Sequence, residues 1–149
     1  MIRTFAEEWY DHFEKEYHKT PFPGGIHKWR EWTIKTLSLI ERMGNNLGYD
    51  VSREKPVRID MSWKKKYLES QVAIEYETYK KGIFDSELLN LASSNARLKI
   101  LITYIKDEET DWYVKEIARR WKTRSKRVWN DELLIIFWYL SHGKSKPYF

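Results

Sequence analysis

The stretch from residue 57 to residue 77 constrains the fold most, because it reads as two short strands around a lysine-rich turn. Apolar and polar residues alternate over 57–62 and again over 72–77. Since successive side chains on a strand point to opposite faces, a hairpin gathers the apolar sets on one face. Asp60, Glu75 and Glu77 then converge on the other face.

These three carboxylates have two explanations. At about 5 Å and an effective dielectric near 20, each ionised pair repels by roughly 3 kcal/mol. A divalent cation between them would reverse that sign, whereas exposure to solvent on the outer face of the hairpin would screen the repulsion. Mg²⁺ prefers oxygen ligands and keeps several waters. In the first explanation Asp60, Glu75 and the main-chain carbonyl of Tyr76 bind Mg²⁺ or Mn²⁺, and Glu77 orients or deprotonates a water or binds a second ion.

Length and composition limit the class of protein. The 149 residues fit one domain, and a hydrophobic share of 42% supports a core. The absence of cysteine excludes disulfides and thiolate metal sites. No apolar run approaches the ~20 residues of a membrane span, and the N-terminus lacks the apolar centre of a signal peptide. We therefore expect a cytoplasmic protein without a membrane partner, and the Lys- and Glu-rich composition is compatible with a thermophile.

The residues before the hairpin predict two helices and a strand. A helix over 4–18 begins with a Thr4–Glu7 capping box and carries an aromatic stripe. A second helix over 26–43 is expected to stop at Gly44. A first strand over 49–53 follows.

The residues after the hairpin predict a crossover. A helix over 84–96 and a strand over 98–104 suggest parallel pairing with the second hairpin strand. A fourth helix starts near 107–110, and its apolar face is expected to contain Val114, Ile117, Ala118 and Trp121.

Two C-terminal segments are less constrained. Residues 133–140 are almost wholly apolar and fit a buried strand or a short helix. The polar tail, residues 141–149, is expected to fray.

This order of elements resembles the PD-(D/E)XK nuclease superfamily, which has the restriction-endonuclease-like fold. The resemblance covers residues 26–105, in the segments E-R-M-G-N-N-L-G-Y-D, R-I-D-M-S-W, V-A-I-E-Y-E and S-E-L-L-N-L-A-S-S-N-A-R-L-K-I-L-I-T-Y. It implies an α/β core of helix, three strands, helix and strand, with a mixed sheet flanked by helices. It also implies that Asp60 and Glu75 hold the metal and that Glu41, on the helix before the first strand, assists.

The sequence departs from the family pattern at two positions. Ile59 stands before Asp60 where many members have proline, and Glu77 stands where the third motif usually has lysine. Some members with E-x-E are active. In others the lysine moves to the following helix, but residues 84–96 contain no lysine. Either Glu77 does the work of the lysine, or the site is impaired.

Two groups of basic residues are candidates for binding phosphates, because dense cations bind nucleic acids through counterion release. The first group, Lys64, Lys65 and Lys66, is expected in the hairpin loop beside the carboxylates. The second group has six basic residues among nine; they are Arg119, Arg120, Lys122, Arg124, Lys126 and Arg127. A solvated basic face, or pairing with the acidic first helix within the domain or across a homodimer, would explain the same residues.

The sequence therefore favours a single domain over 1–149, with an N-terminal helix in 1–22, a core in 26–105 and a C-terminal helix and apolar segment in 106–149. The first hypothesis is a Mg²⁺- or Mn²⁺-dependent nuclease acting on DNA, with RNA as the alternative substrate. The second is a non-catalytic nucleic-acid-binding or assembly protein on a degenerate nuclease fold. A double-strand cutter of this size would most simply act as a symmetric dimer.

Overall fold

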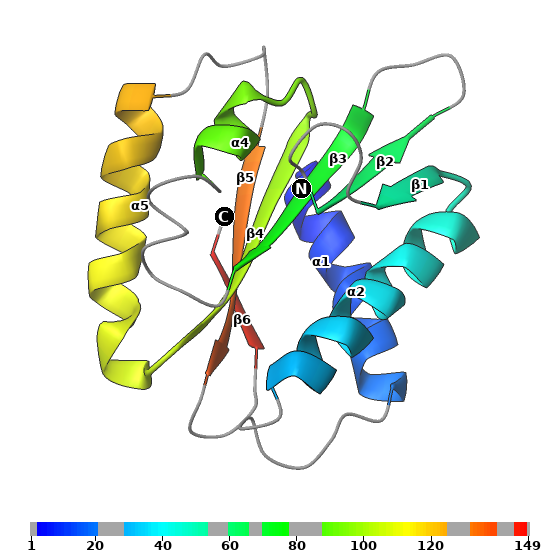
Figure 1. Cartoon of the computed structure of the whole chain (residues 1–149), viewed down its shortest axis with the longest axis horizontal. Coiled ribbons are helices and arrows are strands. Elements are labelled where there is room, and N and C mark those ends of the chain that lie inside the picture. Colours follow the sequence, from blue (N-terminus) through cyan, green and yellow to red (C-terminus); the bar gives the residue numbers. More distant parts are fainter. Residues whose placement is uncertain are drawn as a thin grey trace.

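The computed structural model describes residues 3–20, 29–53, 60–65, 70–77, 88–124, 132–139 and 145–148. It is a mixed α/β fold in which helices flank one mixed sheet (Figure 1). In chain order its elements are α1 (Phe5–Lys19), α2 (Trp29–Asn46), β1 (Asp50–Arg53), β2 (Met61–Lys64), β3 (Ser70–Glu77), α4 (Leu88–Ser93), β4 (Leu98–Ile105), the 3₁₀ turn η3 (Asp107–Glu109), α5 (Thr110–Arg124), β5 (Glu132–Tyr139) and β6 (Ser145–Tyr148).

The strands lie in the sheet in the order in which they occur in the chain, from β1 to β6. The pairs β1–β2 and β2–β3 are antiparallel, β3–β4 and β4–β5 are parallel, and β5–β6 is antiparallel. The parallel pairing expected between the second hairpin strand and the strand after the crossover is confirmed. The segment 106–149 supplies β5 and β6 to the same sheet.

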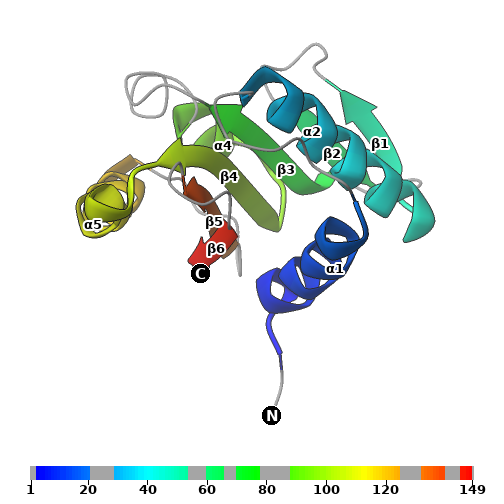
Figure 2. The ribbon, with the colours of Figure 1, turned by 90° about the horizontal axis from the view of Figure 1, so that it is seen from below.

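Each face of the sheet carries its own apolar core. Residues of α1 and α2 pack against Val72, Ile74 and Tyr76 of β3, on what we call the α2 face. Residues of α4 and α5 pack against Ala73 of β3 and Leu101 of β4, on what we call the α5 face. Figure 2 shows α1 and α2 on one side of the sheet and α5 on the other. Side chains that alternate along β3 and β4 therefore belong to different layers.

The first helix begins as its sequence predicts. Thr4 is the N-cap residue of α1, and its hydroxyl oxygen accepts a hydrogen bond of 3.1 Å from the Glu7 amide. The Thr4 hydroxyl also donates to the Glu7 carboxylate at 3.1 Å. The buried residues of α1 include Trp9 and Phe13, so its aromatic stripe faces the sheet. This agrees with a capped amphipathic helix.

The second helix does not stop at Gly44, as the sequence suggested, but continues to Asn46. Gly44 is instead a packing residue, since a Cβ atom there would lie 2.7 Å from the Trp63 ring and 2.7 Å from a Val51 methyl. The turn after α2 uses Gly48, whose φ of 85° is in the left-handed region that glycine readily adopts.

Three further expectations need correction. Lys64 belongs to β2 and not to the hairpin loop, because β2 extends through the buried Trp63. Ala118 on α5 is exposed, and the buried side chain missed there is Tyr113. The tail does not fray at residues 145–148, which pair with β5 as strand β6. The apolar segment 133–140 had two explanations, and the strand is the correct one.

Candidate metal-binding site

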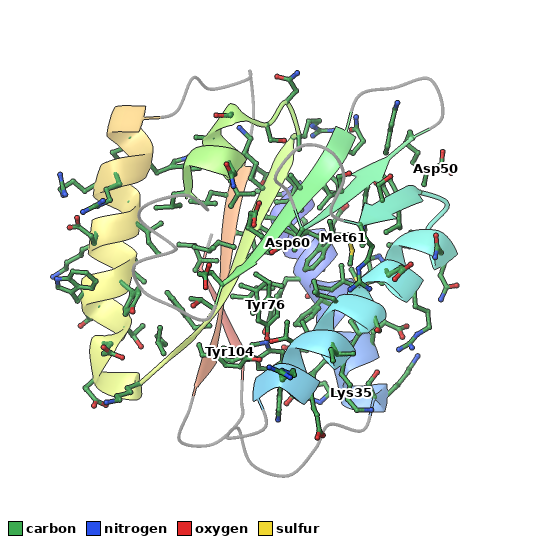
Figure 3. The ribbon with its side chains drawn as sticks, viewed as in Figure 1. Lys35, Asp50, Asp60, Met61, Tyr76 and Tyr104 are labelled. Atoms are coloured by element: carbon green, nitrogen blue, oxygen red, sulfur yellow. The ribbon has the colours of Figure 1, made fainter. Side chains whose placement is uncertain are left out.

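Asp60 lies directly before β2, next to the C-terminal half of β3. Met61 pairs with Ile74 in the antiparallel ladder, so continuing the register by one residue places Asp60 opposite Glu75. The Oδ2 atom of Asp60 accepts a hydrogen bond of 2.7 Å from the amide of Tyr76. Figure 3 labels Asp60 beside β3. The hairpin therefore brings Asp60 to the E-x-E segment of β3.

Glu75 and Glu77 lie on the α5 face, because they alternate with Ile74 and Tyr76, which belong to the α2 face. Glu75 is only 2% exposed, whereas Glu77 is half-buried. A carboxylate inside an apolar layer is costly unless a cation or hydrogen-bond donor compensates it. The position of Glu75 therefore calls for positive charge nearby.

Two polar residues of β4 also lie on the α5 face, and the sequence reasoning did not select either of them. They are Lys99, which is 0% exposed, and Thr103, which is 1% exposed. The parallel register pairs Ala73 with Lys99 and Glu77 with Thr103. The Lys99 ammonium lies 5.4 Å from the centre of the Trp121 ring on α5. The alternation within L-K-I-L-I-T-Y was the pattern that could have identified both.

Tyr76, between the two glutamates, points its side chain to the α2 face. Its hydroxyl donates a hydrogen bond of 2.6 Å to the Tyr104 hydroxyl, which in turn lies 3.3 Å from the hydroxyl of Thr33 on α2. Burial, followed by the interaction with Tyr104, raises the pKa of Tyr76 well above its usual value. Tyr76 and Tyr104 are labelled in Figure 3. These contacts attach the central residue of the E-x-E segment to the helix layer behind it.

Glu41 is not brought to the three carboxylates by any contact among the described residues. It lies on α2, which covers the opposite face from Glu75. Its Oε2 atom accepts a hydrogen bond of 3.0 Å from Nη1 of Arg53 on β1. The structure thus gives Glu41 an ion-pair partner at the edge of the sheet, and the assisting role stays a prediction.

The first basic group lies at the other end of the hairpin from Asp60. Lys64 pairs with Asp50 and with Ser70, while Asp60 adjoins Glu75 and Tyr76. Lys64 is four residue steps along the chain from Asp60, a span of about 13 Å in an extended strand. The Lys65 ammonium lies 4.3 Å from the centre of the Tyr49 ring. The expectation that this group lies beside the carboxylates is therefore wrong for Lys64. Lys66 falls outside the described residues.

The second basic group begins on α5 and is partly neutralised there. Glu116 accepts hydrogen bonds from Arg119 at 2.5 Å and from Arg120 at 2.8 Å. These two guanidinium groups lower the pKa of Glu116 to about 2. Lys122 is exposed, Arg124 ends the helix, and Lys126 and Arg127 fall outside the described residues.

The donor chemistry at Asp60, Glu75, Glu77 and Thr103 suits Mg²⁺ or Mn²⁺, since all four supply oxygen. Within the described part of the chain, no three acidic or histidine side chains are close enough together to form a metal cluster. A site made of two carboxylates and several waters does not require a third acidic or histidine ligand. These residues therefore suit a divalent cation that keeps part of its hydration shell better than one coordinated wholly by protein ligands.

Comparisons with protein-family models, with curated proteins and with solved structures found no match to this chain. Among the described helices, none has the length and apolar character that a membrane crossing requires.

Proposed function

We propose that this protein is a divalent-metal-dependent nuclease that hydrolyses phosphodiester bonds in DNA. The observation that carries the proposal is the hydrogen bond between the Asp60 carboxylate and the Tyr76 amide. It holds an acidic residue that directly precedes β2 beside the E-x-E segment of β3. Two adjacent carboxylates, with phosphate oxygens and water, match the coordination that Mg²⁺ favours.

The sheet supports the restriction-endonuclease-like core that the sequence resemblance implies. The helix α2 precedes three antiparallel strands, β1 to β3, and α4 then leads to β4, which is parallel to β3. The order of these elements is compatible with the resemblance, and the acidic residues lie on β3 (Glu75 and Glu77) and directly before β2 (Asp60). Fold alone does not give function, so the proposal depends on the carboxylates.

In the proposed reaction Asp60 and Glu75 would hold the divalent cation, which would supply Lewis acidity when bound. Glu77 accepts a proton from the attacking water as the water oxygen bonds to phosphorus. The phosphorus–oxygen bond to the leaving nucleotide then breaks. The leaving oxygen keeps the electron pair and takes a proton from solvent, which gives a free hydroxyl and a phosphate monoester.

The test is a cleavage assay with linear, circular and single-stranded DNA, each with Mg²⁺, Mn²⁺ or EDTA. We expect metal-dependent cleavage that falls at least about 100-fold in Glu75→Ala, because metal ligands and general bases contribute factors of this size. Glu14→Ala, on the exposed surface of α1, is the matched control and should cleave normally. Cleavage that survives in Glu75→Ala would point to another site or to a contaminant.

The burial of Glu75 favours a second candidate function. At 2% exposed, this carboxylate has little contact with solvent, and Glu77 replaces the lysine of the family pattern. Both observations fit a non-catalytic nucleic-acid-binding protein on a degenerate nuclease fold. This candidate predicts salt-sensitive DNA binding without cleavage and no rise in melting temperature with Mn²⁺. A Mn²⁺-induced rise that disappears in Asp60→Ala would exclude it.

A further inference from the structure

The outer surface of α5 carries an exposed tryptophan. Trp112 is 46% exposed, whereas every other tryptophan whose side chain the structure describes is at most 6% exposed. An indole is a large apolar side chain that stabilises a protein mainly when it is buried. The exposed part of Trp112 therefore adds little to the core and can contact a ligand.

The Trp112 ring is supported by the apolar layer beneath it. It makes a T-shaped contact with the ring of Tyr113, with 5.2 Å between the ring centroids. Tyr113 is buried and makes a T-shaped contact with Phe137 of β5 at 6.2 Å. An aromatic side chain supported in this way loses little conformational entropy when a ligand binds.

Basic residues continue from Trp112 along the same side of α5. Lys115, Arg119 and Lys122 follow it at steps of three, four and three residues, and all three are exposed. Residues three or four apart are neighbours on a helix surface, so the four side chains form one row about 15 Å long. We call this row of Trp112, Lys115, Arg119 and Lys122 the α5 stripe.

The surface of the α5 stripe is positive although two carboxylates adjoin it. Asp111 lies in the first turn of α5, where a negative charge favours the helix dipole. Glu116 accepts hydrogen bonds from Arg119 and Arg120, which compensate its charge. The basic residues of the stripe, together with Arg120, outnumber these two carboxylates.

An exposed aromatic ring beside a row of cations matches an unpaired nucleic-acid strand. The cations attract phosphates of single-stranded and double-stranded DNA alike. The ring distinguishes the two forms, because it can stack only on a base that is not already paired and stacked within a duplex. A second copy of this chain fits less well, since a symmetric dimer through the stripe would bring like charges together.

The α5 stripe begins at the end of the sheet where the candidate site lies. Glu77 pairs with Thr103 near the carboxyl end of β4, and α5 starts after the 3₁₀ turn that follows β4. In Figure 1, β4 leads into one end of α5, and the helix runs back along the sheet. A DNA strand bound along the stripe would therefore have one end at the end of the sheet where Glu77 lies.

We propose that the α5 stripe binds single-stranded DNA, with one base stacked on Trp112 and the neighbouring phosphates on Lys115 and Lys122. The inference rests on the proposed nuclease function, since it names the class of substrate for that activity. Arg119 adds to the attraction as far as its ion pair with Glu116 allows. Stacking makes the binding depend on unpaired bases and not on their sequence.

The test measures binding in EDTA by fluorescence anisotropy, with labelled oligo-dT and with a duplex of the same length. Trp112→Ala should raise the Kd for oligo-dT at least about fivefold and change the Kd for the duplex by less than about twofold. Trp112→Phe keeps a ring that can stack and should bind oligo-dT within about threefold of the wild type. Ile34→Ala is the matched control, because Ile34 is 57% exposed on α2, across the sheet from α5.

Lys115→Gln and Lys122→Gln test the cations of the stripe. Each substitution should weaken the binding of oligo-dT and reduce the slope of log K against log salt by about 0.7, the value for one phosphate contact with a single strand. Because the substituted side chains are exposed, all of these variants should melt close to the wild type, which separates a loss of binding from a loss of folding.

A Trp112→Ala protein that binds oligo-dT as tightly as Ile34→Ala does would overturn the proposal. So would an equal loss of affinity for oligo-dT and for the duplex, because stacking on an unpaired base affects only the first. Sedimentation velocity examines the other occupant. If the wild type self-associates, and Trp112→Ala is monomeric but binds oligo-dT normally, the stripe is an interface between copies of this chain and the proposal is wrong.

Cleavage assays with Mg²⁺ or Mn²⁺ keep this inference distinct from the nuclease proposal. If the wild type binds oligo-dT through Trp112 but cleaves no DNA, the nuclease function fails and the binding surface stands. If the wild type cleaves oligo-dT and Trp112→Ala has the same KM, the function stands and the role of the α5 stripe is wrong. If both proposals hold, Trp112→Ala should raise the KM for oligo-dT at least about fivefold and lower kcat by less than that.

Discussion

Asp60 combines a structural contact with a negative charge. Its carboxylate accepts a hydrogen bond of 2.7 Å from the Tyr76 amide, just beyond the Met61–Ile74 pair of the described β2–β3 ladder. A buried amide left without a partner costs about 1–3 kcal/mol. The same carboxylate carries the charge that a divalent cation would need. A substitution to alanine removes both properties and therefore cannot tell them apart.

Asp60→Asn separates the two. The asparagine side-chain oxygen can still accept a hydrogen bond from the Tyr76 amide, so the free energy of unfolding should stay close to that of the wild type. In Asp60→Ala the free energy of unfolding should fall by about 1–3 kcal/mol. Both variants should lose the rise in melting temperature caused by Mn²⁺, because both lack the charge. Denaturant unfolding and thermal melting, each with and without Mn²⁺, measure these effects. If the Asp60→Ala protein, which has no side-chain oxygen at this position, is still stabilised by Mn²⁺, Asp60 is not a metal ligand.

The residues of the candidate site were predictable from sequence to different extents. Asp60 and Glu75 were predictable because each is the charged member of an alternating strand pattern. Lys99 and Thr103 lie in a similar pattern, but lysine and threonine are ordinary residues of half-exposed strands. These two side chains are buried only because α4 and α5 pack over β4. That packing depends on tertiary contacts, which the local sequence pattern does not show. The approach of Asp60 to the Tyr76 amide likewise depends on where β2 begins.

At the scale of elements, α5 combines a buried face with a basic surface. Tyr113, Ile117 and Trp121 pack on the sheet, while Arg119 and Arg120 share the carboxylate of Glu116. Exposed pairs of this kind contribute little to stability. Their larger effect is on binding, because a guanidinium held by a carboxylate must exchange that partner for a phosphate.

Glu116→Gln should therefore strengthen the binding of DNA. Released from the carboxylate, Arg119 and Arg120 can each contact a phosphate, and each added contact steepens the dependence of log K on log salt by about 0.9. Fluorescence anisotropy with labelled duplex DNA over a series of salt concentrations measures this slope. Glu14→Gln on α1 changes the net charge equally and is the control. Equal slopes in the two variants would mean that α5 does not contact the DNA.

The elements themselves were predicted well where local patterns are strong, as in the Thr4 cap and the parallel pairing of β4. The errors occurred at boundaries. Gly44 looked like a helix stop, but its lack of a side chain makes room for Trp63 and Val51. Lys64 looked like part of a turn, but Trp63 and the pairing with β1 keep it in β2. In both cases a contact distant in sequence overrode the local preference.

At the scale of the whole molecule, one sheet joins an antiparallel half and a parallel half. The strand β3 pairs with β2 in one half and with β4 in the other, so the candidate site lies where the two halves meet. The parallel half ends at β5, whose residues 134–138 are buried. Such an apolar strand at the edge of a sheet would expose unpaired main-chain groups to other chains. The strand β6 covers that edge, although its sequence, S-K-P-Y, is short and polar.

Deleting the residues after Leu140 should therefore lower the melting temperature and cause self-association. Without β6, the edge of β5 becomes available for pairing with a second copy. Thermal melting and sedimentation velocity at several protein concentrations measure the two effects. A chain that lacks only Phe149 keeps all of β6 and is the control. If the tail were frayed, as its composition suggested, both truncated proteins would melt at the same temperature as the full chain and stay monodisperse. A lower melting temperature in the longer deletion alone would establish that the polar tail is part of the sheet.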